Sequence, residues 1–294
     1  LSPDTHRDFF IMNKSLYFIF TKSIGLYINT LSYLFPKKAT QLAYALFSEP
    51  RKGRLSKNKL PEILSTAQSE TFQIRDNYFQ TYSWKGNENT ILLVHGWESN
   101  ASRWELLLPY LQKSGSTIVA IDGPAHGLSS GKEFNIPQYA EIIRIAVEKF
   151  KPQYLIGHYI GGKTCLYYQS IYQNDTLKKM VVLGAPSDFK IILNNYIELL
   201  SLNTTISKSL EAYYLNNFNL SLEQFSAKLF ASKLNIKGLI AHDSDDTVVL
   251  FEEGEKIAEA WKNVIFIKTK GLGHSMHDDE LYKKVSRFLF ESDN

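Results

Sequence analysis

One glycine-flanked turn in this sequence has the setting of a catalytic nucleophile. Residues 157–161 (GHYIG) follow a short apolar run and precede a stretch with helical periodicity. A strand, a sharp turn and a helix in that order form a nucleophile elbow, in which the central residue of the turn attacks the substrate. The central residue here is Tyr159, where this setting leads us to expect a serine.

An acid and a histidine follow this turn along the chain. Asp246 stands beside Asp245 after another apolar run, and His274 ends the segment 271–274 (GLGH) after the last run. A histidine can act as general base on a nucleophile, and a carboxylate can fix the tautomer of that histidine. The three positions therefore come in the chain order of an α/β-hydrolase triad, namely nucleophile, acid and histidine.

Two more polar segments follow the earlier apolar runs. His95 and Gly96 precede Trp97, and residues 122–127 (DGPAHG) come after the next run. Because α/β proteins place their sites at the carboxyl ends of strands, we expect both segments near the turn at Tyr159. No set of His, Cys, Asp and Glu residues has metal-ligand spacing, so the sequence predicts no metal site.

The elements that position these residues alternate between strands and helices. A strand pair is expected over 72–74 and 78–82, and buried strands over 91–94, 117–121, 154–156, 180–183, 239–241 and 264–267. Helices are expected over 9–34, 37–47, 101–113, 137–150, 162–173, 253–262 and 277–290. Short apolar strands that alternate with amphipathic helices predict an α/β fold with a mostly parallel central sheet flanked by helices.

Two regions outside this alternation are expected to be helical throughout. Residues 1–65 are predicted to form a helical N-terminal arm that packs on the core. Residues 187–233 have helical periodicity and no convincing strand. An insertion at the carboxyl ends of strands commonly covers the site, so we predict a helical lid at 187–233. The core then comprises residues 66–186 and 234–294.

Taken together, these segments resemble the α/β-hydrolase superfamily over about residues 88–292. The motifs that carry the resemblance are residues 95–98 (HGWE), 122–127 (Asp-x-Pro-x-His-Gly) and 271–274 (GLGH), and residues 46–51 (LFSEPR) of the arm also match. Within the superfamily the chain is similar to bacterial, lid-bearing, esterase-like hydrolases. The resemblance implies the α/β-hydrolase fold and hydrolysis of a carboxylic ester or related acyl substrate through an acyl-enzyme, with no cofactor.

The resemblance also implies roles for the acid and the base. His274 would be the general base, and Asp246 would orient its imidazole. Asp246 is preferred over Asp245 because the acid in this group commonly precedes an apolar run such as residues 247–249 (TVV).

The remaining implied site residues lie in two loops. The backbone amides of Trp97 and Ile160 would form the oxyanion hole. His95, Gly96 and His158 would belong to the loops that line the pocket. For His158 the simpler interpretation is a hydrogen bond to the local backbone.

Three interpretations of Tyr159 stay open. Acyl transfer through the phenol is the least favoured, because a phenol with a pKa near 10 is ionised to roughly one part in a thousand at pH 7. A second interpretation is a non-catalytic protein that binds small ligands, with the ring filling the pocket. A third is that tyrosine replaced an ancestral serine and left the other elements intact.

A different motif overlaps the same turn. Residues 157–164 (GHYIGGKT) match the phosphate-loop pattern G-x-x-x-x-G-K-[ST] between a strand and a helix. We keep nucleotide binding as a minor alternative, because the hydrolase interpretation also explains the other segments. In that interpretation Lys163 and Thr164 only form the first turn of the helix.

Composition excludes several classes of protein. The chain has 294 residues and a net charge of +3 with both signs interspersed, which gives no basis for nucleic-acid binding. Its single cysteine, Cys165, excludes an internal disulfide and favours a reducing, cytoplasmic location. No apolar stretch is long enough to span a membrane, although the aromatic-rich segment 9–35 leaves peripheral membrane contact as a hypothesis. We expect a small acyl or ester compound as the partner, and the oligomeric state is not predicted.

Overall fold

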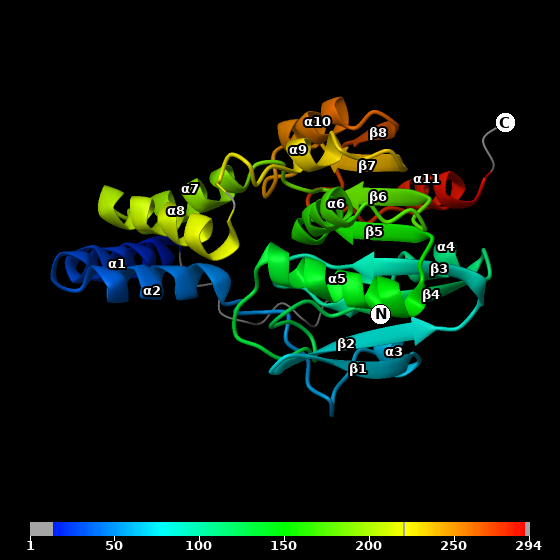
Figure 1. The fold of residues 1–294 in the computed structure, drawn as a ribbon, viewed down its shortest axis with the longest axis horizontal. Coiled ribbons are helices and arrows are strands. Elements are labelled where there is room, and N and C mark those ends of the chain that lie inside the picture. Colours follow the sequence, from blue (N-terminus) through cyan, green and yellow to red (C-terminus); the bar gives the residue numbers. More distant parts are fainter. Residues whose placement is uncertain (1–13, 220, 292–294) are drawn as a thin grey trace. The chain divides into compact units, whose positions relative to one another are not determined.

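An eight-stranded sheet forms the centre of the α/β body in the computed structural model, which describes residues 14–219 and 221–291 (Figure 1). The strand order is β1-β2-β4-β3-β5-β6-β7-β8. The strands are β1 (Gln68–Ile74), β2 (Asn77–Trp84), β3 (Asn87–Val94), β4 (Ser116–Ile121), β5 (Tyr154–His158), β6 (Lys179–Leu183), β7 (Lys237–Asp243) and β8 (Val264–Thr269). Every strand expected from the sequence is present.

The sheet is antiparallel only at one edge. β1 pairs with β2 and β2 with β4 in antiparallel fashion, whereas the pairs from β4 through β3 to β8 are parallel. β3, β5 and β6 are buried along most of their length, because helices cover both faces. The parallel register aligns Val94, Gly157 and Val182, so the loops that follow β3, β5 and β6 leave the same edge of the sheet.

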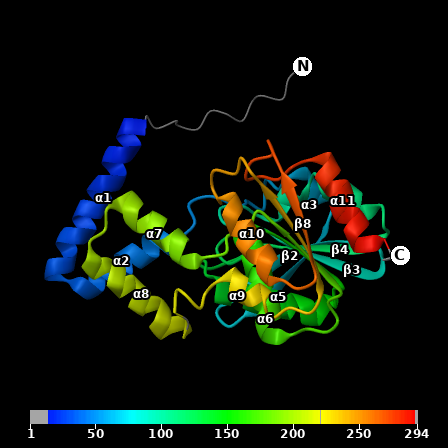
Figure 2. The same cartoon turned by 90° about the horizontal axis from the view of Figure 1, so that it is seen from above.

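Helices cover the two faces of this sheet. Figure 2 shows α5 (Ile136–Phe150), α6 (Ile160–Tyr172) and α9 (Ala227–Ala231) on one side and α3 (Glu62–Ser65) and α11 (Asp279–Phe290) on the other. α10 (Phe251–Ala260) contacts α9 and β7, and α4 (Leu108–Gln112) contacts β4 and α11. Asn135 and Asp278 cap α5 and α11 through side-chain oxygens that accept hydrogen bonds from backbone amides.

One predicted helix needs correction. Residues 101–113 form a 3-10 turn over Ala101–Trp104 and then the short α4, instead of one helix. Pro109 lies in the first turn of α4, where its missing amide is tolerated. In the interior of a longer helix the same residue would remove a hydrogen bond and clash with the preceding turn, so the helix restarts there.

Tertiary contacts divide the chain into two units. One unit comprises residues 48–189 and 223–294, the α/β body, and the other comprises residues 1–47 and 190–222. The second unit contains α1 (Lys14–Leu34), α2 (Pro36–Ser48), α7 (Phe189–Leu200) and α8 (Thr204–Phe218). Residues 48–65, which we predicted as part of the arm, therefore group with the body.

Aromatic contacts join α2 to the inserted helices within the second unit. The rings of Tyr44 and Tyr213 lie 4.1 Å apart, and the hydroxyl of Tyr196 donates to the carbonyl of Ala43 at 2.8 Å. The first expected helix began at residue 9, and residues 9–13 lie outside the described part of the chain. No helix of the described ranges is long and apolar enough to cross a membrane.

Candidate active site

Tyr159 occupies a strained turn between β5 and α6. Its backbone has φ 55° and ψ −125°, a conformation that residues with a side chain rarely adopt. The amide of Tyr159 donates to Leu183 O at 2.9 Å, and its carbonyl accepts from Lys163 N at 3.1 Å. The turn therefore has the backbone geometry that presents a side chain at the top of the sheet, as in a nucleophile elbow.

The glycines on both sides of Tyr159 allow this turn to pack closely. A Cβ at Gly161 would lie 2.3 Å from His95 O, and a Cβ at Gly157 would lie 2.6 Å from the Cα of Gly162. Side chains at these positions would push α6 away from β3 and β5. The glycines of the GHYIG segment thus serve the approach of the helix to the sheet, which fixes where residue 159 points.

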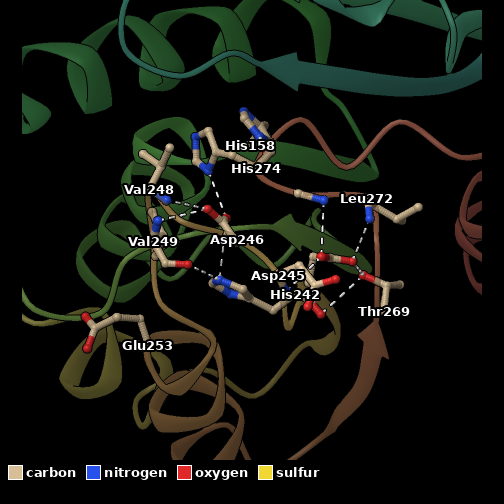
Figure 3. A network of polar contacts seen from close by, with 12 residues as sticks. His158, His242, Asp245, Asp246, Val248, Val249, Glu253, Thr269, Leu272 and His274 are labelled. Carbon is tan, nitrogen blue, oxygen red and sulfur yellow. Dashed lines mark hydrogen bonds and ion pairs between the residues drawn. The ribbon is translucent and has the colours of Figure 1, made fainter. Parts of the chain in front are cut away.

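The predicted acid and base are in contact. His274 Nδ1 lies 2.9 Å from Asp246 Oδ2, and Asp246 Oδ1 accepts hydrogen bonds from Val248 N at 2.8 Å and Val249 N at 3.0 Å (Figure 3). Burial would raise the pKa of Asp246, but the hydrogen bonds from His274 and the two amides outweigh it and hold that pKa below its ordinary value. The carboxylate is therefore ionised at neutral pH and accepts a hydrogen bond from Nδ1–H, which leaves Nε2 of His274 as the basic nitrogen.

Among the residues that the structure describes, the carboxylate of Asp245 has no contact comparable to that of Asp246 with His274. Its side chain is exposed, whereas the side chain of Asp246 is fully buried. Its amide, and not its carboxylate, takes part in the local network by donating to Asp243 Oδ1 at 3.0 Å. Geometry therefore agrees with the choice of Asp246 as the partner of His274.

Asp243 holds the two loops of the acid and the base together, and the sequence analysis missed it. Its Oδ2 accepts from Thr269 Oγ1 at 2.7 Å and Leu272 N at 3.1 Å, and its Oδ1 also accepts from Gly273 N at 3.1 Å. These bonds lower the pKa of Asp243 against the opposing effect of burial. The sequence signal that could have identified it is its position as the last residue of β7, directly before the loop that carries Asp246.

His242 packs beside Asp246 and hydrogen-bonds the loop that carries it. Its Nε2 lies 2.9 Å from Val249 O and 3.8 Å from Asp246 Oδ2. Burial lowers the pKa of His242, so the ring is neutral at pH 7 and Nε2 donates to the carbonyl. Gly254 leaves room for this ring, because a Cβ there would lie 2.4 Å from His242 Nδ1.

The Tyr159 ring lies against the base. Its centroid is 4.7 Å from that of His274, with the two rings nearly perpendicular. Burial, with smaller contributions from Asp246 and Glu98, raises the pKa of Tyr159 to about 12. The phenol is thus protonated under physiological conditions and is a weaker nucleophile than its ordinary pKa suggests.

His158 anchors the base loop and is not placed for proton transfer. Its Nε2 lies 2.9 Å from His274 O, and burial, with the charge of Arg103, holds its pKa well below the ordinary value. Arg103 Nη2 donates to the neighbouring Ser275 O at 2.9 Å. Two donors from different elements therefore fix the backbone of residues 274 and 275.

His95 and Gly96 form the opposite wall of the turn. Gly123 N donates to His95 Nε2 at 2.8 Å, so Nδ1 carries the proton and donates to Gly96 O at 2.6 Å. A Cβ at Gly96 would lie 2.9 Å from the Cβ of Tyr159. The loop after β3 can approach residue 159 closely only because position 96 is glycine.

The amides expected to form an oxyanion hole belong to Trp97 and Ile160. Ile160 is the first residue of α6, whose initial amides have no partner inside the helix. Within residues 14–219 and 221–291, neither amide has a hydrogen-bond acceptor among the protein groups. Both are therefore available to an oxygen atom of a ligand.

The polar side chains of the segment 122–127 make contacts that connect loops of the body. Asp122 accepts from Ala101 N and Leu128 N, each at 2.9 Å, and from the Tyr82 hydroxyl at 3.1 Å. His126 accepts from Glu98 N at 2.9 Å, and burial lowers its pKa to about 4. These bonds tie the loops after β3 and β4 together.

The side chains of Lys163 and Thr164 contact protein groups and are not directed into a phosphate-binding loop. Lys163 is fully buried, its Nζ donates to Ser187 O at 2.8 Å, and it lies over the rings of Phe189 and Phe225. The Thr164 hydroxyl donates to Ile160 O at 2.7 Å. The two side chains that a phosphate loop requires are thus occupied inside the body.

A second polar cluster, also unforeseen, lies where the chain leaves the body after β6. Glu253 Oε2 accepts from Ser187 N at 3.0 Å and Asp188 N at 2.8 Å, and Lys256 Nζ contacts Asp188 Oδ2 at 2.9 Å. Ser226, on the returning segment, donates to Asp188 Oδ1 at 2.9 Å. This cluster pins both ends of the 190–222 insertion to the body.

The strand order, the turn after β5 and the contact between Asp246 and His274 after β7 and β8 are features of the α/β-hydrolase fold. Residues 89–232 match the family model described as alpha/beta hydrolase fold. The chain has the α/β-hydrolase fold, and it is similar in sequence to that family over the matched residues.

Individual relatives are hydrolases or proteins named for likeness to them. The chain is 26% identical over 238 residues to the bifunctional esterase/perhydrolase DCH of Acinetobacter calcoaceticus, covering 65% of this chain and 86% of that protein. It is 37% identical over 102 residues to a human serine hydrolase-like protein, covering 33% of this chain and 49% of that one.

Solved structures share the fold at low sequence identity. A bromoperoxidase from Bacillus anthracis superposes with a TM-score of 0.60 at 19% identity, covering 76% of this chain and all (100%) of that chain. An esterase from Exiguobacterium antarcticum gives a TM-score of 0.57 at 17% identity, covering 74% and 97%.

Proposed function

We propose that this protein is an esterase-type α/β-hydrolase whose acyl-transfer site is intact except at the nucleophile. In this proposal Tyr159 stands at the nucleophile position, His274 is the general base and Asp246 orients it. The amides of Trp97 and Ile160 would stabilise the oxyanion of an acyl intermediate. The observation that carries the proposal is the His274–Asp246 contact of 2.9 Å beside a strained turn at residue 159.

The chemistry of Tyr159 supports a suppressed acyl-enzyme step. With a pKa raised to about 12, the phenol gives too little phenolate at pH 7 to attack an ester efficiently. Its oxygen also lies several ångströms farther from the backbone than a serine hydroxyl would. The ring packs on His274 at the place where substrate would meet the base. We therefore expect the protein as it stands to hydrolyse esters slowly or not at all.

The relatives support the reaction class. The name of DCH assigns esterase and perhydrolase activity to that protein, and the human relative is named as serine hydrolase-like. A small carboxylic ester or related acyl compound is accordingly the substrate class we propose for the ancestral site.

The test is to restore the nucleophile. Tyr159→Ser should hydrolyse short-chain p-nitrophenyl esters at a rate well above that of the unaltered protein. Tyr159→Phe removes only the hydroxyl, leaves the ring in place and should stay inactive. The double variant Tyr159→Ser, His274→Ala should lose about 10³-fold or more of the restored kcat, because the serine then has no base. A folded but silent Tyr159→Ser protein refutes the proposal.

A second candidate is a non-catalytic role in binding small apolar or acyl ligands. The edge-on contact between Tyr159 and His274 favours it, because the ring occupies reactive space while the surrounding donors persist. Short esters or carboxylic acids should then raise the melting temperature of the unaltered protein without being turned over. If ATP or GTP with magnesium gave the same stabilisation, the nucleotide alternative at residues 157–164 would have to be reopened.

A further inference from the structure

Helix α1 of the helical unit has its large apolar side chains on the outside. Leu16 and three pairs of neighbouring residues that recur every seven positions form one stripe along the helix. Their relative exposures range from 56% for Leu16 and Phe20 to 78% for Tyr33. The outward stripe, so defined, consists of Leu16, Ile19, Phe20, Leu26, Tyr27, Tyr33 and Leu34. Helices of globular proteins normally turn such a stripe inward.

The opposite face of α1 is the face that packs, and apart from Ile28 its buried side chains are small. Thr21, Ile28 and Ser32 are buried there, and a Cβ at Gly25 would lie 1.6 Å from Leu200 O. Only glycine lets the helix approach the end of α7 this closely. The packing face therefore has no room for the large side chains of the outward stripe.

Polar contacts fix the rotation of α1 about its axis. Lys22 Nζ donates to Glu198 O at 2.9 Å and Leu199 O at 3.0 Å. Asn29 Nδ2 donates to Ser201 O at 2.8 Å, and Asn29 Oδ1 accepts from Asn203 N at 2.8 Å. Turning the stripe inward would break these bonds, so its exposure is specified by the sequence.

The composition of this region indicates the occupant. Residues 14–48 contain no Asp or Glu, and the exposed Lys37 and Lys38 follow the stripe directly. Exposed tyrosine and phenylalanine beside lysine suit the boundary between lipid headgroups and acyl chains. A helix of 21 residues is about 30 Å long, so the stripe forms an extended line of apolar contact.

We propose that the outward stripe of α1, with Lys37 and Lys38, docks the protein on the surface of an anionic lipid bilayer. The apolar side chains enter the headgroup region and the two lysines contact anionic headgroups. A second copy of the chain fits less well, because a symmetric contact would place the lysines of two stripes together with no acid from residues 14–48 to pair them. The proposal does not depend on activity at Tyr159.

Vesicle flotation tests the proposal with the full chain. The protein should float with vesicles of phosphatidylcholine and phosphatidylglycerol, and less with phosphatidylcholine alone. Leu26→Glu with Tyr33→Glu should lower the partition coefficient at least about tenfold, since each change places a charge on the apolar contact. The matched control is Leu106→Glu with Leu229→Glu, two exposed apolar positions of the α/β body, and it should float like the unaltered protein.

A second pair of variants tests the charge. Lys37→Gln with Lys38→Gln should lower binding to the anionic vesicles about 25-fold, at about 1 kcal/mol or fivefold per lysine, and leave binding to neutral vesicles unchanged. Circular dichroism confirms that each variant is folded.

Three outcomes overturn the proposal. They are no flotation of the folded protein, an equal loss in the body control, and a dimer in sedimentation velocity that Leu26→Glu with Tyr33→Glu dissolves while vesicles bind nothing. The last result would assign the stripe to self-association.

Discussion

At the scale of single residues, the backbone of the turn is suited to a nucleophile, whereas the side chain of Tyr159 is not. The φ of 55° at residue 159 and the glycines around it are features of a turn that presents a nucleophile. The phenol itself is too weakly acidic to serve as one. The sequence allowed both observations to be anticipated, because the turn pattern and the tyrosine are visible in five residues. It did not allow the contact of the ring with His274, which depends on how β5 and the last loop meet.

The pair of neighbouring aspartates gives a prediction at this scale. In the Tyr159→Ser background, Asp246→Asn should lower kcat by about 10³–10⁴-fold, because the imidazole loses the carboxylate that fixes its tautomer. Asp245→Asn is the matched control and should change kcat little, since its side chain is exposed. Steady-state ester hydrolysis measures both. Equal losses would show that the acid has been assigned to the wrong residue.

At the scale of elements, the apolar runs located the parallel strands β3 to β8, because a strand of a parallel sheet covered by helices is apolar along its length. The same reasoning failed for residues 101–113, where Pro109 divides the helix. It also missed Asp243 and Glu253, whose carboxylates accept hydrogen bonds from backbone amides of other loops. Contacts of this kind join segments far apart in sequence, so no local pattern reports them.

The close approach of α6 to the sheet predicts a stability effect. Gly161→Ala should lower the free energy of unfolding by about 1–3 kcal/mol, because the methyl group meets the carbonyls of His95 and Val94. Gly271→Ala is a control for backbone strain alone, with φ 85° and no atom within 4 Å of the added methyl, and should cost about 1 kcal/mol. Urea denaturation compares the two. A smaller loss for Gly161→Ala than for Gly271→Ala would contradict the steric account.

Buried Lys163 on α6 predicts how stability depends on pH. Burial lowers its pKa from 10.5 to about 7 in the folded protein, against the opposing charges of Asp188 and Glu253. Between these values the unfolded chain binds more protons, so the contribution of this group to the free energy of unfolding rises with pH, by at most about 1.4 kcal/mol per unit. Lys163→Met should flatten the profile of unfolding free energy between about pH 7 and 10, whereas the exposed Lys262→Met should not. Parallel profiles for the two variants and the unaltered protein would refute this role of burial.

At the scale of the whole molecule, the α/β body and the helical unit have separate sets of contacts. The two ends of the inserted helices meet in the body, where Asp188 pairs with Ser226 and Ala227 N donates to Ser187 O at 2.8 Å. Helical character in both outer segments was predictable from periodicity. Their grouping into one unit was not, because it depends on contacts such as that of Lys22 with Glu198 across more than 170 residues of chain.

This arrangement predicts that the body folds alone. A chain that begins at residue 48, with residues 190–222 replaced by a short glycine–serine linker, should unfold cooperatively and keep a mixed α/β circular dichroism spectrum. The physical reason is that the sheet, its helices and the cluster at Ser187 lie within the body. If this shortened protein does not unfold cooperatively, the body requires the helical unit to fold.

The most direct test of the central claim is covalent labelling at residue 159. A fluorophosphonate reacts with a serine that a histidine base activates, and intact-mass and peptide mass spectrometry locate the adduct. Tyr159→Ser should be labelled at residue 159, whereas the double variant Tyr159→Ser, His274→Ala and the unaltered protein should stay unlabelled. A folded Tyr159→Ser protein that takes up no label at residue 159 would contradict the claim that a working base and oxyanion site surround this position.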